Sequence, residues 1–181
     1  MKQYVGVDFE GGGNPYKKTL VDVYYDGKKL PFDDNHFDSI LATEVFEHLF
    51  NLDEIVCELH RVLKPGGKML ITCPFLWPEH EQPWDFARYS SFGIKALLER
   101  HGFEMVVQEK TGHYLLCVHQ LIVLYVYYLI PKIPVLYHLL YLVITLPLTL
   151  LTLLLQLVLP KKLKRNDLYL NNVLVVQKLA N

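Results

Sequence analysis

Residues 37–74 read FDSILATEVFEHLFNLDEIVCELHRVLKPGGKMLITCP, and this stretch decides the fold. Phe37–Ala42 and Lys68–Cys73 are short apolar runs of the kind that form buried strands. Between them, apolar residues recur at near-helical spacing from Val45 to Leu63, and Pro65-Gly66-Gly67 predicts the end of that helix. A strand, a helix and a second strand within this length predict a βαβ unit of an α/β layer fold.

The carboxyl ends of these two strands are the expected position of a functional site. In open α/β sheets, ligands bind beyond the carboxyl ends of the strands. Here those ends are residues 42–44 (ATE) and residues 72–75 (TCPF). The following run, residues 74–93, combines aromatic, proline and charged residues, which is typical of an ordered loop over a site.

The remaining soluble part of the chain supplies further predicted elements. A helix is expected from Ser90 or Ser91 to Arg100, because serine caps helices and Gly102 stops this one. Gly11-Gly12-Gly13 lacks the GK[ST] ending of a phosphate loop, so a flexible connection is favoured there. Four further strands are predicted at Tyr4–Val7, Thr19–Tyr25, Phe103–Gln108 and Asn172–Lys178.

Composition and charge exclude one class of partner and indicate another. The 181 residues carry a formal net charge of -1, which gives no electrostatic reason to expect nucleic-acid binding. From Tyr114 to Leu159 the only Lys, Arg, Asp or Glu is Lys132. Two apolar runs, 114–130 and 133–159, flank a predicted turn at residues 131–134. Segment 114–159 is therefore expected to contact membrane lipid.

The two strands that flank this segment belong to one predicted sheet, so the chain must return to the side of the membrane that it left. Either a two-helix transmembrane hairpin or a hairpin dipping into one leaflet meets that condition, and a helical pair buried in a soluble core is the alternative. The expected domains are an α/β domain at 1–112 and 168–181, and a membrane-associating helical insert at 113–167. The basic residues that follow the insert predict a membrane-associated protein with its α/β domain on the cytoplasmic side. These basic residues are Lys161, Lys162, Lys164 and Arg165.

Several short motifs, taken together and in this order, resemble a known family. They are Tyr4-Val5-Gly6-Val7-Asp8, Asp26–Phe32 (DGKKLPF), Phe37-Asp38, Glu47-His48 and Arg61–Gly67 (RVLKPGG). The combination resembles class I S-adenosylmethionine-dependent methyltransferases, and in particular the type 11 branch. The resemblance implies a Rossmann-like sheet, with the apolar hairpin inserted before its last strand, and S-adenosylmethionine as cofactor.

The resemblance also implies which residues hold that cofactor. Asp8 is similar to the acid that accepts hydrogen bonds from the ribose hydroxyls. Asp26 is similar to the residue that reads the adenine amino group, with Gly27 allowing close backbone approach. Thr43 and Glu44 lie where the family's cofactor pocket meets the substrate. A turn-forming Asp26 and a helix-capping Thr43 are the structural alternatives.

One part of the family pattern is expected to be missing before Tyr4. The family's first strand and glycine-rich turn would precede this point, so an N-terminally truncated sheet is predicted. An internal start in a longer gene product, a degenerate relative and completion by another chain are three explanations. Gly11-Gly12-Gly13 follows the wrong strand to substitute for the missing turn.

The run HEQPWDFARY, residues 80–89, supplies the candidate catalytic residues. It is similar to a stretch found in many members of the branch. His80 titrates near neutrality and could accept a proton, Asp85 could orient it, and Arg88 could hold an anionic substrate group. Tyr89 completes the set. The alternative is a structural loop, in which Asp85 and Arg88 form a salt bridge and His80 caps a turn.

No metal site is expected from the sequence. Glu44 and His48 are spaced four residues apart on the predicted helix, but two ligands without a third do not define a site.

Two functions follow from these patterns. The first is methyl transfer from S-adenosylmethionine to a small, glycan-linked or lipid-linked acceptor at the membrane surface, where the insert would raise the local concentration of an amphiphilic substrate. The second is a non-catalytic, methyltransferase-like module that binds a membrane or a partner, or a truncated fragment that does not bind the cofactor alone.

Overall fold

The computed structural model describes residues 4–10, 21–130, 136–160 and 165–180. The chain divides into two compact units, Met1–Glu109 with Asn172–Asn181, and Lys110–Asn171. The predicted bounds of the insert, 113–167, fall inside the second of these. The elements in order are β1 (Val7–Phe9), β2 (Val23–Tyr25), β3 (Phe37–Thr43), the 3₁₀ helix η2 (Phe46–His48), α1 (Leu52–Val62), β4 (Leu63–Pro74), α2 (Ser91–Arg100), β5 (Phe103–Lys110), α3 (Tyr114–Leu129), α4 (Leu136–Val158) and β6 (Asn171–Lys178).

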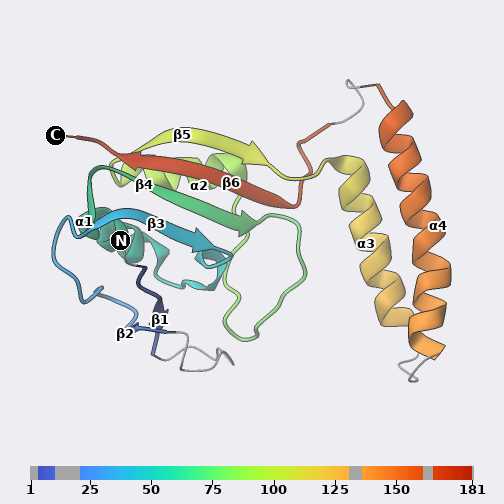
Figure 1. Ribbon diagram of the computed structural model, residues 1–181, viewed down its shortest axis with the longest axis horizontal. Helices are drawn as coiled ribbons and strands as arrows, with labels where there is room; N and C mark the ends of the chain where they lie inside the picture. The colour runs from blue at the N-terminus through green and yellow to red at the C-terminus, as the bar shows by residue number, and fades with distance from the viewer. Residues whose placement is uncertain (1–3, 11–20, 131–135, 161–164, 181) are drawn as a thin grey trace. The chain divides into compact units, whose positions relative to one another are not determined.

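The described strands form two sheets. β1 and β2 pair in parallel, and a four-stranded sheet has the order β3-β4-β6-β5. β3 and β4 are parallel and joined through η2 and α1, which confirms the predicted βαβ unit. The arrow of β6 runs opposite to those of β3, β4 and β5 (Figure 1), so the sheet is mixed. The α/β, Rossmann-like fold class is confirmed.

The region between β3 and β4 differs in detail from the prediction. The helix does not begin at Val45, because Glu44 adopts a positive φ of 52° and the chain then makes only the short η2 before α1 starts at Leu52. Pro65-Gly66-Gly67 lies within the irregular start of β4, where the register shifts between Phe37 and Ser39 of the partner strand. A Cβ at Gly67 would lie 2.8 Å from the Lys64 carbonyl oxygen, so this tight bend requires glycine.

The first two strands are shorter than expected. β1 begins at Val7, so Asp8 lies inside the strand and not after it. β2 begins at Val23, and the predicted start of that strand at Thr19 lies outside the described residues, as does the Gly11-Gly12-Gly13 loop. The helix from Ser91 to Arg100 is confirmed, with the Ser90 side chain accepting a hydrogen bond from the Gly93 amide.

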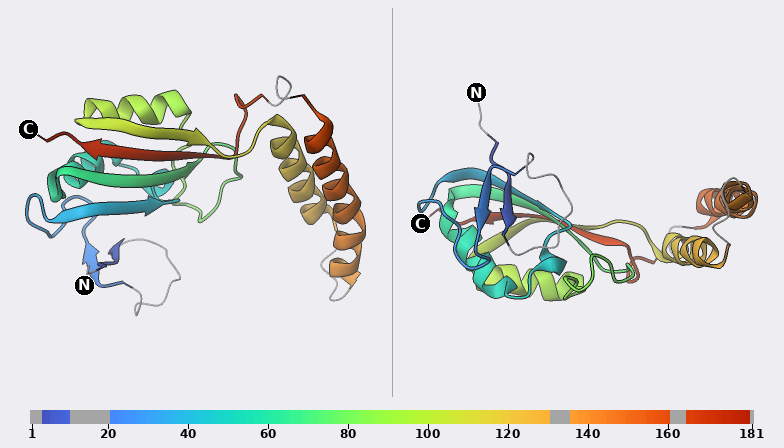
Figure 2. Two further views of the ribbon diagram at one scale, coloured as in Figure 1. Left: turned by 45° about the horizontal axis from the view of Figure 1, so that its top comes forward. Right: turned by 90° about the horizontal axis from the view of Figure 1, so that it is seen from below.

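The main core lies on one face of the four-stranded sheet. Figure 2 shows α1 and α2 on the same side of it. The buried core residues include Val56 of α1, Leu98 of α2, Ile71 of β4 and Val176 of β6. On the opposite face, the register partners Leu41 and Leu70 are 56% and 38% exposed. No described helix therefore covers that face at these two residues.

Arg61 joins the β1–β2 region to α1. Its guanidinium donates hydrogen bonds to the carbonyl oxygens of Leu30 and Phe32 and to the Glu58 carboxylate. A second apolar cluster forms beneath it from Tyr25, Leu30, Ile55 and Val62. Arg61 of the RVLKPGG motif is thus part of the architecture.

The second unit contains the two apolar helices. α3 has 16 residues, which is about 24 Å and shorter than a bilayer's hydrocarbon core of roughly 30 Å. In α4, Tyr137–Val158 is long and apolar enough to cross a membrane by length and composition, with a mean hydropathy of 2.1 and 11% of the window buried. Between the helices, His119 contacts the hydroxyls of Thr149 and Thr152. The predicted turn with Lys132, together with Lys161, Lys162 and Lys164, lies outside the described residues.

Candidate functional site

The carboxyl ends of β3 and β4 meet as the sequence predicts. The Glu44 amide donates to the Thr72 carbonyl oxygen over 2.9 Å, and the Thr72 hydroxyl donates to Glu44 Oε1 over 2.7 Å. Thr43 is the last residue of β3 and pairs with Thr72. It does not cap a helix, since η2 begins only at Phe46. The positive φ of Glu44 turns the chain from the strand into η2, which places that helix at the sheet edge.

Asp8, Asp26 and Gly27 lie on the parallel pair β1–β2. Asp8 is opposite Tyr24, and Asp26 follows the end of β2. Both carboxylates raise the pKa of the Tyr25 hydroxyl, although burial of that ring is the larger cause, so the two acids lie near the same side chain. Asp26 Oδ1 also accepts from the amides of Lys28 and Lys29. The alternative of a turn-forming Asp26 therefore describes its contacts.

Gly27 has the backbone freedom that the family resemblance requires. Its φ is +78°, and a Cβ there would lie 2.7 Å from the Phe9 ring. Its carbonyl oxygen accepts a hydrogen bond from the Asn51 side chain, just before α1. Asp26, Gly27 and Glu44 thus follow strand ends of one compact unit, and Asp8 lies within β1 of the same unit. Their contacts with a nucleoside stay a prediction.

The loop after β4 is organised by Arg88. This residue donates to both carboxylate oxygens of Asp85, over 2.5 and 2.6 Å, and to the carbonyl oxygens of Trp77, Pro78 and Ala87. An arginine has five N–H donors, and five protein acceptors take them here. The role of Arg88 toward an anionic substrate therefore stays a prediction, because its donors already have acceptors within the loop. The salt-bridge alternative describes it.

His80 lies beside this pair, whereas Tyr89 does not join it. His80 Nδ1 is 3.2 Å from Asp85 Oδ2, and the His80 amide donates to the same oxygen over 2.9 Å. The predicted orienting contact of Asp85 on His80 is therefore present. The Arg88 hydrogen bonds are the main cause that holds the pKa of Asp85 at about 2. Tyr89 packs partly buried against the core, and burial raises the pKa of its hydroxyl.

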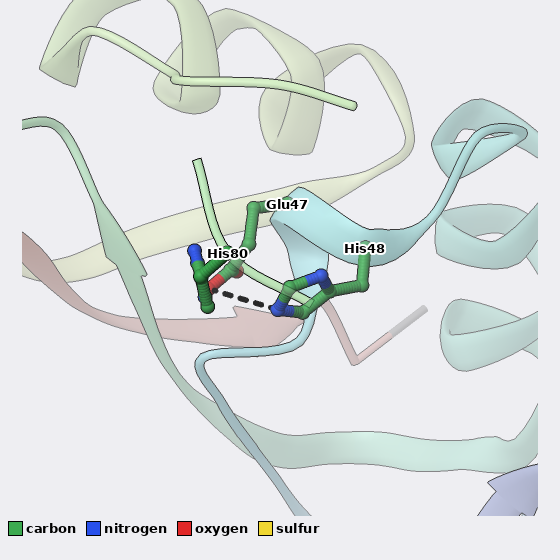
Figure 3. Close-up of side chains that lie close together, drawn as sticks. All are labelled: Glu47, His48 and His80. Carbon is green, nitrogen blue, oxygen red and sulfur yellow. Dashed lines mark ion pairs between the residues drawn. The ribbon is translucent and has the colours of Figure 1, made fainter. Parts of the chain in front are cut away.

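Glu47 is a residue of this site to which the sequence analysis gave no role, although it named Glu47-His48 as a family motif. Its side chain is 0% exposed, and burial raises the pKa of its carboxyl. Figure 3 shows Glu47, His48 and His80 together, with one ligand atom of each lying within 4.8 Å of the others. Glu47 and His48 come from η2 and His80 from the loop after β4. The adjacent Glu47-His48 pair was visible in the sequence, but only the fold brings His80 to it.

Two hydrogen bonds hold the loop against η2. The Phe86 amide donates to the Glu47 carbonyl oxygen over 2.8 Å, and His48 Nδ1 lies 2.7 Å from the Trp84 carbonyl oxygen. These contacts place the loop over the carboxyl ends of β3 and β4. The site is therefore built from two segments 30 to 40 residues apart in the chain that meet at one sheet edge.

The fold is similar to that of one solved structure, and part of the chain matches a family model. The structure of the [4+2]-cyclase SpnF has a TM-score of 0.51 at 17% identity, over 91% of this chain and 58% of that one. A SAM-dependent methyltransferase from Methanosarcina mazei has a TM-score of 0.48 at 14% identity, over 88% and 67%. Residues 2–71 match the family model described as a methyltransferase domain. The matched segment, which is less than half of the chain, is similar to a methyltransferase domain.

Curated methyltransferases match the chain over a shorter stretch. The mitochondrial 2-methoxy-6-polyprenyl-1,4-benzoquinol methylase of Bos taurus is 42% identical over 30% of this chain and 17% of its own length. The ubiquinone/menaquinone biosynthesis C-methyltransferase UbiE of Shewanella pealeana is 42% identical over 33% of this chain and 23% of its own. The chain thus matches less than a quarter of the length of either relative.

Proposed function

We propose that this protein takes part in methyl transfer from S-adenosylmethionine to a small acceptor molecule. The match of residues 2–71 to the methyltransferase domain family carries the proposal. The predicted nucleoside-binding acids, Asp8 and Asp26, lie on neighbouring parallel strands of the matched segment, which agrees with this function. When bound, the cofactor supplies an electrophilic methyl group on a sulfonium for in-line displacement.

The residues of the chain divide the work of binding and orientation. Asp8 accepts from the ribose hydroxyls, Asp26 and Gly27 face the adenine, and Glu44 borders the acceptor side. His80 accepts the proton of an oxygen or nitrogen acceptor, and Asp85 keeps the His80 ring oriented through Nδ1. Arg88 keeps Asp85 ionised and the loop in place.

We further propose that the acceptor is amphiphilic and that the second unit brings the domain to a membrane. Large apolar side chains of α4 are exposed, including Leu142, Leu150 and Leu157, and such a surface fits lipid. One relative is named for a polyprenyl-benzoquinol substrate, which is an amphiphile. The basic residues after the insert favour the cytoplasmic face. A lipid-linked acceptor is therefore expected, and its methyl-accepting group is a quinol or a glycan.

Cofactor binding by the full chain tests the core of this proposal. Isothermal titration with S-adenosylhomocysteine, in detergent micelles, is expected to give one site. Asp8→Asn should weaken it at least tenfold, because a carboxylate accepts both ribose hydroxyls better than an amide. Glu104→Gln, at an exposed position of β5, is the control and should leave affinity unchanged. Absence of binding by the unaltered chain would contradict the proposal.

The nature of the acceptor is tested separately. Membranes or lipid extracts incubated with the chain and methyl-labelled S-adenosylmethionine should yield label that partitions into organic solvent. Label found only in the aqueous phase would contradict the lipid-linked acceptor and leave methyl transfer intact. Labelling of Lys132 from the far side of sealed vesicles distinguishes a spanning hairpin from one confined to a leaflet.

One observation favours the second candidate, a non-catalytic module. The described strands form two sheets, with β3 at one edge of the larger sheet. A module of this kind predicts liposome flotation through the second unit without any heat from cofactor titration, so the same two measurements decide between the candidates.

A further inference from the structure

The Glu47 carboxylate is a buried charge without a satisfying partner. Its side chain is 0% exposed, and neither oxygen has a hydrogen-bond partner among the described residues. A buried, unsatisfied polar group costs about 1–3 kcal/mol, and a charged one costs more. Native structures contain few such groups, so this one needs an explanation such as a proton or an ion.

Two histidines lie close to this carboxylate. His48 Nε2 lies 3.7 Å from Glu47 Oε1, which is too long for a hydrogen bond. The His48 and His80 rings are 4.8 Å apart between centroids and inclined by 76°. One nitrogen of each ring and one oxygen of Glu47 lie within 4.8 Å of one another (Figure 3).

The hydrogen bond of His48 determines which of its nitrogens faces the carboxylate unprotonated. His48 Nδ1 is 2.7 Å from the Trp84 carbonyl oxygen. A carbonyl oxygen only accepts, so Nδ1 carries the proton, and Nε2 of the neutral ring presents a lone pair. That lone pair and the lone pairs of Glu47 repel each other unless a proton or a cation lies between them.

His80 has a similar arrangement, with Asp85 in the place of the carbonyl. His80 Nδ1 is 3.2 Å from Asp85 Oδ2 and 3.4 Å from Arg88 Nη2. Arg88 Nη2 already donates to Asp85 over 2.6 Å, so the carboxylate is the better partner for Nδ1–H. Nε2 is then the nitrogen left for a ligand. A metal-binding histidine usually donates its other N–H to a carboxylate or carbonyl in this way.

We propose that Glu47, His48 and His80 bind a divalent transition-metal ion, with Zn²⁺ as the best match. Two imidazoles and one carboxylate are the protein ligands of many zinc sites with an open position. A tetrahedral ion with bonds of ~2.1 Å separates its ligands by about 3.4 Å. The distance of 3.7 Å between Glu47 Oε1 and His48 Nε2 is already close to this ligand separation. All three ligand atoms lie within 4.8 Å of one another, so the loop that carries His80 has to close by roughly 1 Å.

Ion binding at the proposed site requires neither the cofactor nor the acceptor. The site joins η2 to the loop after β4. A bound ion would therefore hold the two segments together in addition to the hydrogen bonds Phe86–Glu47 and His48–Trp84. The ion would also occupy the His80 nitrogen that the metal-free chain uses for proton transfer. Metal binding can therefore be measured without cofactor or acceptor.

Zinc titration of the full chain tests this site. The chain is prepared in detergent without a polyhistidine tag, treated with chelator and titrated with ZnCl₂ by calorimetry. One equivalent is expected to bind. Glu47→Gln and His80→Asn should each weaken binding at least tenfold. His36→Gln, which replaces an exposed histidine outside the cluster, should leave the affinity unchanged.

A second set of side chains makes a necessary control. Cys57 Sγ lies 3.1 Å from His101 Nδ1, and His101 Nε2 lies 2.8 Å from Asp53, so zinc could bind there instead. Cys57→Ser should therefore retain the bound equivalent. Loss of binding in Cys57→Ser, retention in both site variants, or no binding by the unaltered chain would each overturn the proposal.

Cobalt gives a readout that does not depend on how the variants fold. Co²⁺ bound by two imidazoles and a carboxylate in a tetrahedral site should give visible absorption without the intense thiolate band that a Cys57 site would produce. Added Zn²⁺ should abolish the visible bands by displacing Co²⁺. A spectrum with the thiolate band, or no visible absorption, would contradict the assignment.

Discussion

Arg88 Nη1 and Nη2 donate to the two carboxylate oxygens of Asp85 over 2.5 and 2.6 Å, and the Asp85 side chain is only 3% exposed. The same guanidinium donates to three carbonyl oxygens of the loop. A planar, five-donor group is the element that holds this loop in one conformation.

Arg88→Lys is expected to loosen the loop, because an ammonium cannot reach acceptors arranged around a planar fork. The loss should be about 1–3 kcal/mol in the free energy of unfolding. Urea unfolding followed by fluorescence of Trp77 and Trp84, both in the loop, measures it. Arg100→Lys, in an exposed pair with Asp53, is the control and should cost at most ~0.5 kcal/mol. Equal costs would contradict the role of Arg88.

Acid should weaken the same loop. The pKa of Asp85 is lowered to about 2, chiefly by its hydrogen bonds from Arg88. Since the pKa is lower in the folded chain, the stabilisation is complete above the unfolded value of about 4 and is lost as the pH falls toward 2. It amounts to roughly 2 kcal/mol. The difference in unfolding free energy between the unaltered chain and Asp85→Asn should shrink from pH 5 to pH 2. A difference in unfolding free energy that stays constant between pH 5 and pH 2 would contradict this role of the Asp85 carboxylate.

Gly27→Ala should destabilise the β1–β2 region more than Gly66→Ala destabilises β4. Both glycines have positive φ, of +78° and +76°, so both alanines carry about 1 kcal/mol of backbone strain. Only at Gly27 does the new Cβ meet an aromatic ring, 2.7 Å from Phe9, whereas at Gly66 the nearest atom is 3.8 Å away. Thermal unfolding of the two variants isolates the steric part, which should add about 1–2 kcal/mol.

Arg61→Lys should separate the Leu30–Phe32 segment from α1. Its guanidinium bonds two carbonyl oxygens of that segment and the Glu58 carboxylate, and the hydrogen bonds from Arg61 are the main cause that lowers the pKa of Glu58. The expected cost is about 1–3 kcal/mol. Lys64→Met, which removes an exposed pair with Asp38, should cost at most ~0.5 kcal/mol. Hydrogen exchange at the Leu30 amide, which donates to Glu58, reports the change locally.

Local patterning was enough for the elements whose hydrophobic period and caps agree. The βαβ unit from Phe37 to Pro74 and the Ser90-capped helix needed only spacing, glycine and serine signals, because those depend on residues close in sequence. The sequence did not show that the helix fails to begin at Val45, since Glu44 has a positive φ and contacts Thr72 from the next strand.

The amino-acid sequence by itself determined the fold class, the family resemblance and the two apolar helices, because periodicity and composition are properties of the chain alone. Only the tertiary structure decided that the Arg88 guanidinium donates to Asp85 and that Tyr89 packs on the core. It also decided that Glu47 is buried beside His48 and His80. Those outcomes depend on which segments meet at the sheet edge. Which hydrogen-bonding groups of a side chain remain available for a ligand depends on the contacts that the fold gives that side chain.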